Sequence, residues 1–181
     1  MSDSLHHPKK ITIGFSKSKL KFPILAWLIQ LVEGTKFSHS YIKWHSSKYD
    51  TTLYYHATSN TVNFMSEEAF LKKHQPVQEY TLLVREETFT KVIQFAMKNA
   101  GKPYSFMQLF AILFVKLGFP NILNKTQQKS AYICSELVAE ILRDVIKVTG
   151  KDLDKPLDLM TPKDIQQFLW DNMNFGSKGD R

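Results

Sequence analysis

Cys134 is the only cysteine of the 181-residue chain, and its position suits a nucleophile. Apolar residues recur from Ile133 to Val148 at the i, i+3, i+4, i+7 spacing of one helical face. This pattern predicts a helix with Cys134 in its first turn, on the buried side. The free N–H groups and the positive dipole end at a helix start stabilise a thiolate and lower its pKa. The alternative is a small apolar side chain in the core, because free cysteine is among the most buried residue types.

A cysteine hydrolase also needs a base and a polar group that orients the base. His39 and His56 fall inside two predicted strands of one hairpin, 37–44 and 51–57, where diagonal neighbours can share a face. The alternatives are two unrelated half-buried histidines, or a zinc pair. Two histidines and one distant cysteine are an incomplete zinc ligand set, so no metal is expected. The other four histidines are expected to be solvated: His6, His7, His45 and His74.

The elements that must position these residues alternate between strands and helices, which predicts an α+β fold. Period-two patterns predict strands at 10–15, 37–44, 51–57, 61–65 and 79–85. The three strands between 37 and 65 form an antiparallel β-meander. Gly14, inside the first strand, indicates a bulge or a close approach of the backbone.

Helices are predicted at 23–34, after Ser66, after Thr88, at 105–117, from 133 onward and after Thr161. Ser66, Thr88 and Thr161 are expected as N-caps, the last followed by Pro162 and by an acid at Asp164. Segment 105–117 is apolar on nearly every face. It is therefore expected to be buried, or to form a lipid-facing patch.

Size and composition indicate one domain over 10–175, between a flexible N-terminus at 1–9 and a flexible tail at 176–181. The net charge is +7, from 24 basic and 17 acidic residues. Basic residues between Lys9 and Lys21 suit a solvated tail, or contact with an anionic membrane or a cell-wall polymer. One cysteine excludes an internal disulfide and a cysteine-rich metal site.

No signal peptide is visible, and the apolar stretches 22–32 and 109–115 are shorter than the ~18–20 residues that span a bilayer. A cytoplasmic protein is therefore expected. Peripheral association with a membrane, or export by another route such as a phage lysis system, stays open.

The order of several short motifs resembles a known family. Phe37-Ser38-His39-Ser40-Tyr41-Ile42 is followed by Tyr55-His56-Ala57, Gly101-Lys102-Pro103-Tyr104, Tyr132-Ile133-Cys134-Ser135-Glu136 and Met160-Thr161-Pro162. This series is similar to the circularly permuted papain-fold hydrolases of the YaeF/YiiX type, relatives of NlpC-type peptidases and of lecithin retinol acyltransferase. The resemblance spans about residues 10–169.

The resemblance implies a permuted papain-like (NlpC-like) fold, with a barrel-like antiparallel sheet packed against helices. It implies Cys134 as nucleophile, His39 as base, and His56 where the family often has Glu, Asp or His. Tyr104 matches a pocket element, although it is equally suited to the core. Tyr132 and Ser135, which flank the cysteine motif, are further pocket candidates. The backbone N–H of Cys134 would stabilise the oxyanion, and no cofactor is expected.

Three functions follow as hypotheses. The first is a cysteine amidase or peptidase acting on a peptide or a cell-wall fragment through an acyl-enzyme. The second is an acyltransferase or lipase-like thiol enzyme acting on lipid esters at a membrane. The third is a basic, non-catalytic module that binds nucleic acid or cell-wall polymer, although no nucleic-acid motif is present.

Overall fold

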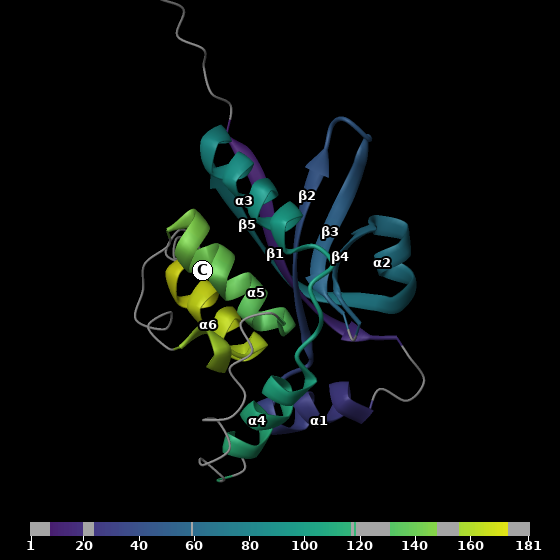
Figure 1. The fold of residues 1–181 in the computed structure, drawn as a ribbon, viewed down its shortest axis with the longest axis vertical. Coiled ribbons are helices and arrows are strands. Elements are labelled where there is room, and N and C mark those ends of the chain that lie inside the picture. Colours follow the sequence, from purple (N-terminus) through teal and green to yellow (C-terminus); the bar gives the residue numbers. More distant parts are fainter. Residues whose placement is uncertain are drawn as a thin grey trace, which may run out of the picture.

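Five antiparallel strands form one sheet in the order β4-β3-β2-β1-β5 (Figure 1). The computed structural model describes residues 8–19, 24–58, 60–116, 118, 131–147 and 156–173. The strands are β1 (Lys9–Ser18), β2 (His39–Ser46), β3 (Thr51–Ala57), β4 (Val62–Ser66) and β5 (His74–Val84). The predicted meander is confirmed as β2-β3-β4, with β1 beside β2.

Helices cover both faces of this sheet, so the predicted α+β class is confirmed. They are α1 (Ile24–Glu33), α2 (Glu67–Lys73), α3 (Glu86–Asn99), α4 (Phe106–Lys116), α5 (Cys134–Glu140) and α6 (Pro162–Met173). A π-helical segment, Ile141–Ile146, continues α5, and a 3-10 turn spans Leu157–Leu159. In Figure 1, α3, α5 and α6 lie on one side of the sheet and α2 lies on the other.

The two faces of the sheet bury different sets of side chains, because successive residues of a strand point to opposite sides. Ile42 and Tyr55 point toward α5 and form the main core with Leu137. Tyr41 points the other way and packs against Phe70 of α2, with ring centroids 4.7 Å apart. Alternate residues of β2 and β3 therefore pack against different helices, α5 on one face of the sheet and α2 on the other.

Gly14 confirms the predicted close approach. It pairs with Tyr41 across β1 and β2, and a Cβ atom at Gly14 would overlap the Tyr41 ring. The Tyr41 hydroxyl donates a hydrogen bond of 2.6 Å to Glu79 of β5. The missing side chain thus lets an aromatic ring lie flat over β1 and reach the next strand.

Two of the three predicted N-caps are confirmed. Ser66 accepts a hydrogen bond from the backbone of Ala69 at the start of α2. The Thr161 hydroxyl accepts from the backbone N–H of Asp164, whose carboxylate accepts from the Thr161 N–H in return. The prediction for Thr88 is wrong: the N-cap is Arg85, three residues earlier, and α3 begins at Glu86.

The fifth strand begins earlier than predicted, at His74 rather than at residue 79. Pro76 indicates a helix end, and α2 does end at Lys73, but the chain then enters the sheet directly. β5 is an edge strand, where a proline without an N–H is tolerated. Pro76 pairs with Ser16 at a register shift.

Several predictions lie outside the described residues: the N-terminal segment over 1–7, the loop 119–130 and the tail 176–181. Within the described residues, none of the helices combines the length and the apolar character that crossing a bilayer requires.

Candidate functional site

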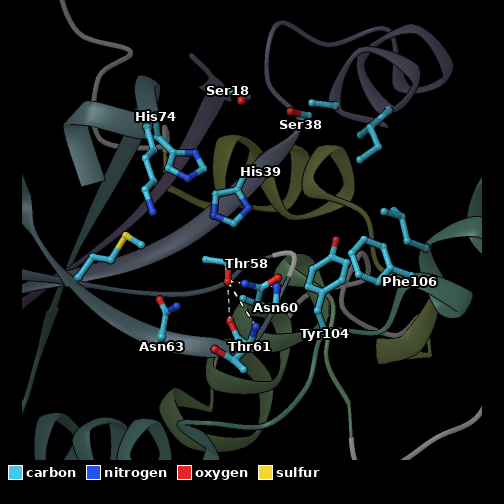
Figure 2. Close-up of a pocket in the computed structure, with 16 residues that line it drawn as sticks. Ser18, Ser38, His39, Thr58, Asn60, Thr61, Asn63, His74, Tyr104 and Phe106 are labelled. Atoms are coloured by element: carbon cyan, nitrogen blue, oxygen red, sulfur yellow. Dashed lines mark hydrogen bonds between the residues drawn. The ribbon is translucent and has the colours of Figure 1, made fainter. Parts of the chain in front are cut away.

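A pocket of about 490 Å³ lies at the end of the sheet where β2 begins (Figure 2). Residues of β1, α1, β2, α2, α4 and the β3–β4 turn contribute to its walls. Figure 2 shows His39 and His74 on one side of the view, with Tyr104 and Phe106 on the other. Ile29 and Leu109 add apolar surface from α1 and α4. The pocket thus combines imidazole groups with an apolar wall.

His39 and His56 are brought together as the strand pattern predicts. His39 is the first residue of β2, and Ile42 lies opposite Tyr55 in the β2–β3 ladder, so the two histidines are diagonal neighbours. His39 Nε2 lies 2.9 Å from His56 Nδ1, a hydrogen bond whose direction depends on the tautomers. The pair shares the α2 face of the sheet with Tyr41.

His74 joins this pair, so the prediction that it is solvated is wrong. Its ring stacks on that of His39 with centroids 4.9 Å apart, and on Phe70 at 4.6 Å. Because α2 passes directly into β5, the residue at the junction lies over the sheet instead of in a loop. One ligand nitrogen from each of His39, His56 and His74 lies within 4.8 Å of the others, so these three could hold a metal ion. A predicted strand that began at residue 74 would have indicated that His74 lies over the sheet with the other two histidines.

The environment keeps all three rings neutral at pH 7. Burial is the main cause: it holds the pKa of His39 well below its ordinary value and lowers the pKa of His56 to about 3 and of His74 to about 4. The neighbouring imidazoles and the Lys73 ammonium oppose a further positive charge. Each ring therefore keeps one lone pair for a proton or a metal.

Cys134 is the first residue of α5 and is 5% exposed, as its predicted place in the first buried turn requires. The backbone and side chain of Ser40, and the backbone N–H groups of Ser135 and of Cys134 itself, lie close enough to the sulfur to lower the pKa of the thiol, although the Ser40 hydroxyl has no hydrogen-bond partner within the described residues. These groups favour the thiolate, but burial outweighs them and raises the pKa of the thiol. The resting group is a neutral thiol surrounded by donors.

Cys134 and His39 approach the start of β2 from different sides. Ser40, which lies beside the thiol, is two residues from Ile42 and faces α5 as Ile42 does. His39 is two residues from Tyr41 and faces α2 as Tyr41 does. Within the described residues, the hydrogen bond of the His39 ring goes to His56, and none joins it to Cys134. Ser40, which faces the thiol, and His39, which carries the imidazole, are therefore adjacent in β2 but point to opposite faces of the sheet.

Tyr104 connects the pocket with the cysteine. It lines the pocket, and its electrostatic coupling to Cys134 adds to the burial that raises the pKa of its phenol. Tyr132 pairs with Tyr104 in a short parallel bridge. Tyr132 and Ser135 are buried and are not among the residues that line this pocket. Of the three predicted pocket residues, Tyr104 is therefore the one with access to a ligand there.

Comparison with known proteins leaves the site to be interpreted from its own geometry. No protein-family model and no curated protein matches this sequence.

Proposed function

We propose that this chain is a cysteine hydrolase that cleaves an amide bond through an acyl-enzyme on Cys134, with His39 as base and His56 as its orienting partner. The observation that carries the proposal is the 2.9 Å hydrogen bond between His39 and His56, beside Ser40, whose polar groups lower the pKa of the Cys134 thiol. The proposed base, with its orienting partner beside it, thus lies one residue along β2 from Ser40, which faces the proposed nucleophile on the other side of the sheet.

The tautomers of the histidine pair support a base role for His39. If His39 donates its Nε2 proton to His56 Nδ1, the lone pair of His39 is on Nδ1. That nitrogen is then the proton acceptor for the thiol. The proposal requires the Cys134 sulfur and His39 Nδ1 to come within hydrogen-bond distance when substrate fills the pocket.

The reaction would proceed in two steps. His39 Nδ1 takes the thiol proton while the sulfur attacks the substrate carbonyl carbon, and the proton passes to the leaving amine as the C–N bond breaks. A water molecule then attacks the thioester and gives one proton to His39; that proton returns to the sulfur as the carboxylic acid leaves. The N–H groups of Cys134 and Ser135 are donors for the oxyanion of both tetrahedral intermediates.

The proposal includes the permuted papain-like fold that the sequence resembles. The strand with His39 precedes the helix with Cys134 in the chain, and α5 packs against β2. Both features support this fold, as does the position of the cysteine at the helix start.

The test is the labelling rate of Cys134 with a small vinyl sulfone at pH 7, measured by mass spectrometry. We expect labelling faster than that of glutathione, and a loss of at least about tenfold in His39→Gln. His45→Gln, which changes an exposed histidine of the same strand, is the matched control. Labelling no faster than glutathione and unchanged in His39→Gln would overturn the proposal.

A second candidate, a thiol enzyme that acts on lipid esters at a membrane, is favoured by the surface beside the pocket. Ile29 and Leu109 line the pocket from α1 and α4, two helices that lie side by side in Figure 1. The same helices expose Trp27 (59%), Leu31 (62%) and Met107 (68%). An apolar wall that continues into exposed apolar side chains suits an acyl chain that leaves a bilayer.

Vesicle flotation separates the two candidates. With anionic vesicles, the lipid version predicts that the protein floats and that the triple variant Trp27→Ser, Leu31→Ser, Met107→Ser does not. Met97→Ser, which removes an equally exposed methionine from α3, is the control. A wild-type protein that stays at the bottom of the gradient leaves the amidase as the remaining candidate.

A further inference from the structure

Three histidines from separate parts of the chain converge on the α2 face of the sheet. His39 begins β2, His56 lies near the end of β3, and His74 joins α2 to β5. One nitrogen of each lies within 4.8 Å of the others. In Figure 2, the rings of His39 and His74 both face the pocket.

The hydrogen bond between His39 and His56 does not satisfy the cluster. His56 is fully buried, yet its Nε2 has no hydrogen-bond partner within the described residues, and neither does Nδ1 of His74. Buried polar nitrogens without partners are uncommon, because a group removed from water normally finds a replacement for it. Two such atoms in one cluster, each on a ring with metal-binding capacity, indicate a missing ligand.

We propose that His39, His56 and His74 form a binding site for a divalent transition-metal ion, with zinc as the expected occupant. Imidazole nitrogen is a preferred ligand of zinc, whereas calcium and magnesium select oxygen. Two nitrogens bound to one tetrahedral ion at about 2.0–2.1 Å are about 3.3 Å apart. The separations in the cluster exceed this value by at most about 1.5 Å, which small rotations of the rings close.

The pocket gives the ion a route of entry and an open coordination position. His39 and His74 line the pocket, and His56 lies beneath them. Three protein ligands with a fourth position toward solvent is an arrangement that zinc adopts in proteins. Lys73, which also lines the pocket and adjoins His74 in sequence, repels positive charge at the cluster, so the ion must be held by the three imidazole bonds.

Metal binding and the base role of His39 exclude each other. A neutral imidazole has one lone pair, so an ion on either nitrogen of His39 leaves none for the Cys134 proton. Zinc is therefore expected to inhibit the cysteine chemistry. This last consequence rests on the proposed function, but the existence of the site does not.

The test is titration of the untagged full-length protein with Co²⁺, whose visible absorption is strong in tetrahedral sites. His6→Gln and His7→Gln are introduced into every sample, because this adjacent pair can bind metal by itself. We expect saturation at one ion per chain, displacement by Zn²⁺, and an affinity at least about tenfold weaker in His74→Gln. His45→Gln, an exposed histidine of β2, is expected to bind as the parent does.

Two further variants distinguish failure of the metal-site proposal from failure of the cysteine hypothesis. Cys134→Ala is expected to retain full Co²⁺ binding, so that failure of the cysteine hypothesis leaves the metal site intact. His39→Gln changes the other half-buried member of the cluster and is expected to weaken Co²⁺ binding as His74→Gln does, with circular dichroism to check that both variants fold. Absence of tetrahedral Co²⁺ absorption in the parent, or equal affinity in His74→Gln and the parent, would overturn the proposal and assign the unpaired nitrogens to ordered water.

Discussion

The face of the sheet under α5 and the face under α2 differ in what they bury. Under α5, aliphatic and aromatic side chains fill the interior, and the chemistry-bearing group is a single thiol at the edge. Under α2, a small aromatic cluster adjoins three imidazoles. Buried polar atoms without a hydrogen-bond partner within the described residues occur on both faces: Ser16 Oγ, His56 Nε2, Asn63 Oδ1 and His74 Nδ1 on this face, and the Ser40 and Tyr55 hydroxyls on the α5 face.

We infer from this difference that one face contributes most of the stability of the fold and the other carries most of the groups that could bind a ligand. The α5 face holds the fold together mainly through apolar burial, whereas the α2 face concentrates imidazole nitrogens that a ligand, water or a metal can satisfy. The two meet where His39 and Ser40, adjacent in β2, point to opposite sides. The expected effects of substitutions should follow this division.

The largest effect is expected from damage to the α5 face. Leu137 is fully buried in the main core, so Leu137→Ala removes apolar contacts and leaves a cavity. We expect the free energy of unfolding to fall by about 2–5 kcal/mol, measured by urea denaturation. Leu83→Ala, at a side chain that is 64% exposed, should change it by less than about 0.5 kcal/mol. Equal losses in the two variants would contradict the assignment of this face as the stabilising core.

The α2 face should make the protein sensitive to acid. The pKa of His74 is about 4 and that of His56 about 3, against an ordinary value of 6.5. Between pH 6.5 and 4, His56 and His74 therefore bind protons in the unfolded chain but not in the folded protein. The free energy of unfolding is highest above pH 6.5 and decreases as the pH falls through this range. The shift for His74 alone corresponds to a loss on the order of 3 kcal/mol.

Urea denaturation at several pH values across this window measures the loss. The double variant His56→Gln, His74→Gln should show a much flatter dependence, whereas His45→Gln should follow the wild type. A wild-type protein as stable at pH 4 as at pH 7 would show that the imidazoles are not held neutral by burial.

A smaller loss in the free energy of unfolding is expected at Gly14 of β1, beside Tyr41. A Cβ atom there overlaps the Tyr41 ring, so Gly14→Ala must displace the ring that covers β1. We expect a loss of about 1–3 kcal/mol in the free energy of unfolding. In the background of Tyr41→Ala the same substitution should cost much less, because the overlapping ring is gone. Additive losses in the double variant would place the strain elsewhere.

The sequence predicts the strands, most helices and two caps because these depend on local pattern: alternation along 37–65, and the Ser66 and Thr161 signals. The pairing of His39 with His56 follows from strand parity and is also predictable. His74 is not, because its place over the sheet depends on where β5 begins, and Pro76 indicates a helix end more strongly than an edge strand. The buried approach of Ser40 to Cys134 is a tertiary contact almost a hundred residues apart, which no local pattern encodes.

That contact supplies the finest test of how the two faces meet. The Ser40 side chain lowers the pKa of the Cys134 thiol, and its hydroxyl has no hydrogen-bond partner within the described residues. Ser40→Ala therefore removes a polar group that favours the thiolate and leaves the backbone N–H groups in place. Without this side chain, burial is opposed by fewer polar groups, so the pKa of the thiol should rise further. The pH dependence of alkylation by iodoacetamide measures this shift, with Ser46→Ala at the other end of β2 as control. A rise in Ser40→Ala alone would mean that Ser40, next to His39 in sequence but on the α5 face, tunes the nucleophile. An unchanged midpoint would leave the thiol isolated from β2 and remove the support that Ser40 gives to a shared site.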